Sequence, residues 1–142
     1  MDGVILPDAD WRHRAGLDRL VAALGEARFV GGSVRDTILG LPVSDVDIAT
    51  PLPPEEVIER LRESMIKCVP TGLKHGTITA VLPDGPVEVT TLRRDVATDG
   101  RHATVAFTDD WREDAARRDF TINALYADPI SGQVFDYFGG LD

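Results

Sequence analysis

The sequence predicts an α/β (α+β) fold in which helices flank a small mixed β-sheet. Predicted strands alternate with helical segments along the chain and lie at residues 28–30, 45–49, 66–69, 77–82 and 87–92. The last three are rich in β-branched residues. The turn sequence Pro83-Asp84-Gly85-Pro86 separates the last two as a hairpin would. With 142 residues, the chain has the size of one domain and is long enough to bury a core.

The elements of the first half follow from apolar spacing and from glycines and prolines. Apolar residues recur at helical spacing over residues 11–24, and Gly25 follows as a helix C-cap. A short helix is expected after Gly31-Gly32, closing at Gly40. Residues 55–63 predict an amphipathic helix, because prolines precede it and acids lie in its first turn.

The second half is expected to contain one helix and one further hairpin. Residues 93–108 show no periodicity and predict a mobile loop. A helix over 111–118 follows, with Asp109 or Asp110 as its N-cap. Residues 125–136 predict a hairpin around the turn Pro129-Ile130-Ser131-Gly132.

Composition and charge exclude several classes of protein. Hydrophobic residues make up 43% and charged residues 27% of the chain, which is typical of a globular domain. The formal net charge of −9 argues against a simple basic nucleic-acid-binding module. Cys68 is the single cysteine, so an internal disulfide framework is excluded. The single cysteine fits a reducing cytoplasm, where we expect the protein to be located. No apolar run approaches the roughly 20 residues of a membrane span, so we expect no membrane partner.

Three acidic residues form a candidate metal site. Asp45 and Asp47 are two residues apart on a predicted strand, so their side chains share one face and their Cα atoms lie about 6.7 Å apart. Glu88 offers a third carboxylate on another predicted strand. Such oxygen ligands suit Mg²⁺, and three acids from two strands could hold two ions roughly 3.5–4 Å apart. Taken alone, the Asp-x-Asp pair is more typical of a solvated strand face.

A candidate phosphate site precedes these acids. Gly31-Gly32 ends a strand and opens a helix, so backbone N–H groups and the positive end of the helix dipole would face an anion. Arg35 lies one turn into that helix and could add a bidentate contact to the same phosphates. Asp36 is expected to be structural, paired with Arg35 or with a backbone amide. A glycine pair alone is more often a tight turn.

A third motif, Arg117-Arg118-Asp119-Phe120-Thr121-Ile122-Asn123-Ala124, suggests a family. By itself it would be a helix end where Arg117 and Arg118 pair with Asp114 or Glu113 at the surface. Together with Gly31-Gly32-Ser33-Val34-Arg35-Asp36 and Asp45-Val46-Asp47, however, it resembles the head domain of class II tRNA nucleotidyltransferases. These are the CCA-adding enzymes and bacterial poly(A) polymerases of the polymerase β-like nucleotidyltransferase superfamily.

The resemblance implies a nucleotidyltransferase fold, a single head domain over residues 1–142, and a set of site residues. Asp45 and Asp47 match the metal-binding carboxylates, and Glu88 resembles the supporting third acid. The positions that match nucleotide contacts are Gly31, Gly32, Arg35, Arg118, Asp119 and Asn123. The implied cofactor is Mg²⁺.

The implied reaction is template-independent transfer of CMP and AMP from CTP and ATP to the 3′-hydroxyl of tRNA, with release of pyrophosphate. The family's base-selecting segment and its tRNA-gripping domains lie outside these residues, so we expect the isolated head to lack base selection. One alternative is a poly(A) polymerase or an enzyme that adds only C or only A. An alternative of another class is a nucleotide- or RNA-binding module without turnover.

Overall fold

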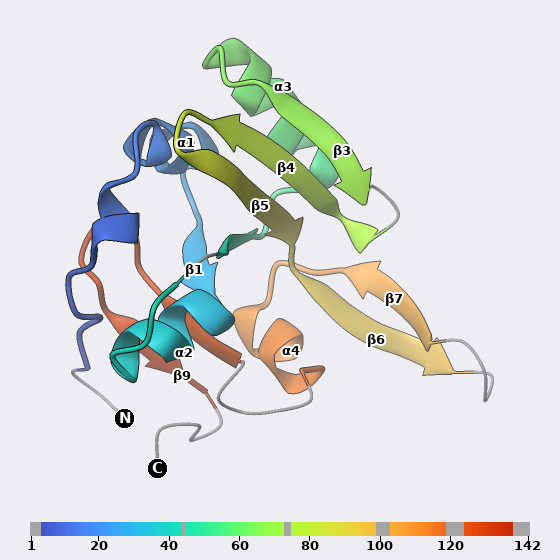
Figure 1. The fold of residues 1–142 in the computed structure, drawn as a ribbon. Coiled ribbons are helices and arrows are strands. Elements are labelled where there is room, and N and C mark those ends of the chain that lie inside the picture. The colour runs from blue at the N-terminus through green and yellow to red at the C-terminus, as the bar shows by residue number, and fades with distance from the viewer. Residues whose placement is uncertain (1–3, 44, 73–74, 99–102, 119–123, 138–142) are drawn as a thin grey trace.

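A seven-stranded mixed sheet forms the centre of the molecule (Figure 1). The computed structural model describes residues 4–43, 45–72, 75–98, 103–118 and 124–137. Its strands are arranged in the order β3-β4-β5-β2-β1-β8-β9, and helices flank them. The predicted fold class is therefore confirmed.

The elements have the following bounds. The helices are the 3₁₀ helix η1 (Asp10–His13), α1 (Leu17–Leu24), α2 (Gly32–Ile38), α3 (Pro54–Glu63) and α4 (Trp111–Ala116). The strands are β1 (Arg28–Val30), β2 (Val46–Thr50), β3 (Cys68–Gly72), β4 (Thr77–Leu82), β5 (Gly85–Thr91), β6 (Arg93–Thr98), β7 (Ala103–Phe107), β8 (Leu125–Ala127) and β9 (Val134–Asp136). Both predicted hairpins, β4–β5 and β8–β9, are confirmed.

Strand pairing aligns the two acid-bearing strands. β2 runs parallel to β5, and Asp47 is the direct Cα partner of Glu88. On its other edge β2 pairs antiparallel with β1, which in turn pairs antiparallel with β8. The connection between the two parallel strands contains α3, β3 and β4. Asp45 lies immediately before β2 rather than within it.

The middle of the sheet is buried on both faces. Phe29 and Ile48 belong to a large core under α1 and α3, where the rings of Phe29 and Trp11 meet edge to face with centroids 4.8 Å apart. Their neighbours in sequence, Val30 and Ala49, belong to a second cluster with Trp111, Tyr126 and Leu92. Because side chains alternate along a strand, β1 and β2 contribute side chains to both hydrophobic clusters and are packed on both faces.

The prediction of a loop over residues 93–108 is wrong for the described part of that segment. β6 and β7 pair antiparallel as a separate two-stranded sheet that extends away from the end of β5 (Figure 1). The register shifts between Asp95 and Ala97, which obscures the alternation by which a strand is recognised from sequence.

In the described part of the chain, no helix is long and apolar enough to cross a bilayer.

Candidate active site

Asp45, Asp47 and Glu88 line one hollow in the surface of the sheet, about 300 Å³ in volume. The parallel pairing of β2 with β5 places Asp47 beside Glu88 on the same face. Thr79 of β4 is the Cα partner of Glu88 and also lines the hollow. The structure therefore brings together the three acids predicted from sequence, although they come from distant parts of the chain.

The hollow concentrates negative charge. Burial raises the pKa of Asp47 to about 6, and the charges of Glu88 and Asp45 add to the rise. The positive charge of Arg118 acts in the opposite direction on the same pKa. An acid that is kept from ionising by its neighbours is a favourable ligand for a cation, since the cation relieves the repulsion.

The carboxylate oxygens of the hollow suit a hard divalent cation that is also bound by the phosphate of a ligand. Among the described residues, no three acidic, histidine or cysteine side chains are gathered closely enough to complete a metal site by themselves. Mg²⁺ is typically held by one or two carboxylates together with substrate phosphates and water, so it does not require such a cage. The carboxylates of the hollow therefore fit a cation that binds together with a phosphate.

The candidate phosphate site lies at the N-terminus of α2. Gly31 precedes the helix with a φ of 74° and a ψ of −134°, a conformation that favours glycine, and its amide donates to the carbonyl of Leu125. Arg35 pairs with Asp36, as predicted, with Nε 2.8 Å from Oδ1. A Cβ built on Gly32 would lie 3.4 Å from Nη2 of Arg35. The arginine therefore folds back over the start of its helix, close to the glycine pair.

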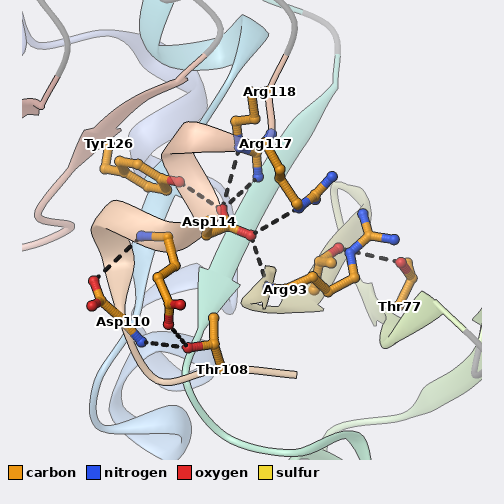
Figure 2. A network of polar contacts seen from close by, with 10 residues as sticks. Thr77, Arg93, Thr108, Asp110, Asp114, Arg117, Arg118 and Tyr126 are labelled. Atoms are coloured by element: carbon orange, nitrogen blue, oxygen red, sulfur yellow. Dashed lines mark hydrogen bonds and ion pairs between the residues drawn. The ribbon is translucent and has the colours of Figure 1, made fainter. Parts of the chain in front are cut away.

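Arg118 is fixed at the end of α4 by Asp114 (Figure 2). Its Nε and Nη2 lie 3.3 and 3.1 Å from Oδ2 of Asp114, and Nε of Arg117 lies 3.4 Å from Oδ1. The Arg118 charge also acts to lower the pKa of Asp47. Asp119 and Asn123, the other two nucleotide contacts predicted near this helix, lie outside the described residues.

Comparison with known proteins agrees with this geometry. The sequence profile described as the Poly A polymerase head domain matches residues 27–142. The chain belongs to this family. The match contains every residue predicted here to contribute to the site.

Relatives of this head domain carry it within longer chains. The mitochondrial CCA tRNA nucleotidyltransferase 1 of Mus musculus is 50% identical over 116 residues, which cover 81% of this chain and 26% of the relative. The CCA-adding enzyme of Enterococcus faecalis is 40% identical over 136 residues, covering 94% of this chain and 32% of the relative. The chain thus spans about a quarter to a third of the length of these curated relatives.

Solved structures resemble this head domain in fold. The Bacillus stearothermophilus CCA-adding enzyme in complex with CTP matches with a TM-score of 0.72 and 40% identity, over 86% of this chain and 29% of that one. A tRNA nucleotidyltransferase complexed with a primer tRNA and an incoming ATP analog matches with a TM-score of 0.63 and 32% identity, over 87% and 34%. The mixed sheet with flanking helices is therefore the head-domain nucleotidyltransferase fold.

Sequence reasoning on this head domain underestimated Asp114. The (i, i+4) spacing to Arg118 suggested a surface ion pair, but Asp114 is only 1% exposed and also accepts from Tyr126 Oη at 2.6 Å. Buried apolar neighbours in the sequence, Trp111 and Ala115, were the available signal that this face of α4 is turned inward.

Asp110 is the N-cap, because its carboxylate accepts from the amides of Arg112 and Glu113.

The glycine pair of the head domain allows a matched test of backbone strain, because only Gly31 has a positive φ. Gly31→Ala is expected to lower the free energy of unfolding by about 1 kcal/mol, because the alanine must adopt a positive φ. Gly32 lies in the helix α2, so Gly32→Ala is expected to change the free energy of unfolding by less than about 0.5 kcal/mol. Urea unfolding measures both values. An equal loss in the two variants would contradict the assignment of strain to Gly31.

Proposed function

We propose that the chain is the catalytic head of a template-independent nucleotidyltransferase that adds CMP and AMP from CTP and ATP to the 3′-hydroxyl of tRNA. The observation that carries the proposal is the pairing of Asp47 with Glu88 in one hollow, where Asp45 contributes a third carboxylate. The names of the relatives, which are CCA-adding enzymes and CCA tRNA nucleotidyltransferases, support this reaction among those open to the family. We also propose a cytoplasmic location, since one cysteine and no internal disulfide suit a reducing compartment.

In the proposed reaction, the RNA 3′-hydroxyl attacks the α-phosphorus of the triphosphate and pyrophosphate leaves. Asp45, Asp47 and Glu88 would hold Mg²⁺, which supplies positive charge that stabilises the attacking and leaving oxygens. The backbone amides at Gly31 and Gly32 would bind the triphosphate together with the nearby guanidinium of Arg35. No covalent bond to the protein is required, so positioning and charge neutralisation account for the acceleration.

Triphosphate binding tests this proposal directly. Calorimetry with CTP and with ATP, each with and without Mg²⁺, is expected to show Mg²⁺-dependent binding of both nucleotides with similar affinity. The double variant Asp45→Ala/Asp47→Ala is expected to lose that binding, because the cation and the phosphates it accompanies lose their ligands.

A charge-matched variant serves as the control. Glu55 and Glu59 are exposed on α3, so Glu55→Ala/Glu59→Ala removes the same charge away from the hollow. Binding retained by the aspartate variant, or lost equally in the glutamate variant, would overturn the assignment of the hollow as the catalytic site.

A further inference from the structure

Asp114 is a buried carboxylate that joins three separate segments of the chain (Figure 2). Its Oδ1 accepts from the backbone amide of Arg93 at 2.9 Å, and its Oδ2 accepts from Tyr126 Oη and from the guanidinium of Arg118. Burial works against its charge, but Arg118, Tyr126, the Arg93 amide and Arg117 outweigh burial and lower the pKa of Asp114. The carboxylate therefore stays ionised inside the protein.

Each segment joined at Asp114 leads to a part of the candidate active site. Arg93 begins β6, separated by one residue from the end of β5, the strand that carries Glu88. Tyr126 is the Cα partner of Val30, the residue before Gly31. Arg118 follows α4, and its positive charge acts to lower the pKa of Asp47. One carboxylate thus connects β6, which follows the strand of Glu88, with β8, which pairs with the strand before the glycine pair, and with Arg118 at the end of α4.

Within the part of the chain that the structure describes, the ion pair with Asp114 uses one edge of the Arg118 guanidinium. A guanidinium carries five N–H donors, and the pairing with Asp114 engages Nε and Nη2 along one edge. The side chain of Arg118 is 21% exposed, so it is neither sealed in the core nor freely solvated. Holding a long side chain in place before binding removes the entropic cost of ordering it when the ligand arrives.

We propose that Asp114 is a positioning residue that holds the guanidinium of Arg118 at the end of α4 before a nucleoside triphosphate binds. The choice of ligand rests on the proposed function, whereas the positioning of Arg118 is a property of the free chain. A residue that only stabilised the fold would affect unfolding and leave triphosphate binding in the folded protein unchanged.

Two variants of the same network separate positioning from stability. Asp114→Asn removes the charge that pairs with Arg118, and Tyr126→Phe removes one hydrogen bond to the same carboxylate while the ion pair remains. Asp114→Asn is expected to weaken Mg²⁺–CTP binding about tenfold, whereas Tyr126→Phe is expected to stay within about twofold of the wild type. In an Arg118→Gln background, Asp114→Asn is expected to have no further effect on binding, because the two residues act as one unit.

NMR of the arginine side chains tests the positioning without any ligand. The Nε–H signal of Arg118 is expected to be dispersed and slow to exchange in the wild type and in Tyr126→Phe, and to lose this protection in Asp114→Asn. Loss of protection together with absent Mg²⁺–CTP binding by the wild type would support positioning and count against the proposed function. Protection that persists in Asp114→Asn, or binding that falls equally in Tyr126→Phe, would overturn the positioning role.

A further variant covers the case in which Asp114→Asn does not fold. Arg118→Lys keeps one positive charge but lacks the Nε–Nη2 edge that Asp114 holds. It is expected to fold and to bind Mg²⁺–CTP about tenfold more weakly than the wild type. Wild-type affinity in Arg118→Lys would show that charge alone is sufficient and would overturn the proposal.

Discussion

Replacing Asp45 and Asp47 with asparagine is expected to lower nucleotide transfer about 1000-fold or more while the fold is retained. Asparagine keeps the shape of each side chain but removes the charge that binds a cation, and a loss of about 4 kcal/mol of transition-state stabilisation corresponds to that factor. The remaining carboxylate, Glu88, would have no acidic neighbour on β2.

The measurement is incorporation of labelled CMP into tRNA that lacks its 3′ terminal nucleotides, with circular dichroism to confirm folding. Glu55→Gln/Glu59→Gln on the exposed face of α3 provides the matched control and should transfer at the wild-type rate. Transfer within tenfold of the wild type by the aspartate variant would show that these acids do not hold the catalytic cation.

Asp47→Asn is expected to stabilise the metal-free protein at pH 8 by about 2 kcal/mol, allowing for partial solvent screening of a half-buried group. Burial and the neighbouring acids raise the pKa of Asp47 from 3.8 to about 6, so the folded state binds its proton more tightly than the unfolded state. Between these two values the wild type loses stability as pH rises, because the carboxyl is ionised in the unfolded state while it stays protonated in the folded state. Below about pH 4 the acid is protonated in both states, and the advantage of asparagine disappears.

Urea unfolding in the presence of a chelator, from pH 4 to pH 8, measures this difference. Added Mg²⁺ should stabilise the wild type at pH 8 more than it stabilises Asp47→Asn, because the cation binds the folded carboxylates. A pH-independent difference between the two proteins would contradict repulsion in the hollow as its cause.

Local patterns were sufficient to predict most of the fold. Gly25, the prolines before α3 and the turn at residues 83–86 are signals confined to a few neighbouring residues, and the elements they delimit are confirmed. The hairpin β6–β7 was missed because its strands are irregular in register and their pairing depends on a partner several residues away. Alternation alone did not distinguish it from a loop.

The site shows the same division between local and non-local information. Asp45 and Asp47 are recognisable because their spacing on one strand is itself the signal. The role of Asp114 depends on Tyr126 and on the amide of Arg93, whose proximity arises only when α4 packs against β8 and β6. Spacing along one helix therefore predicts an ion pair but cannot predict whether that pair is buried.

The parallel alignment of β2 with β5 has a consequence for how the protein acquires its activity. A slip of one residue in that alignment would turn Glu88 to the opposite face of the sheet, so a mispaired chain could have normal secondary structure and no acidic hollow. The two strands are joined through α3, β3 and β4, so the aligned pair forms only after a long loop has closed. Recovery of cation binding during refolding would therefore report correct strand alignment, and it should lag behind the recovery of helical signal.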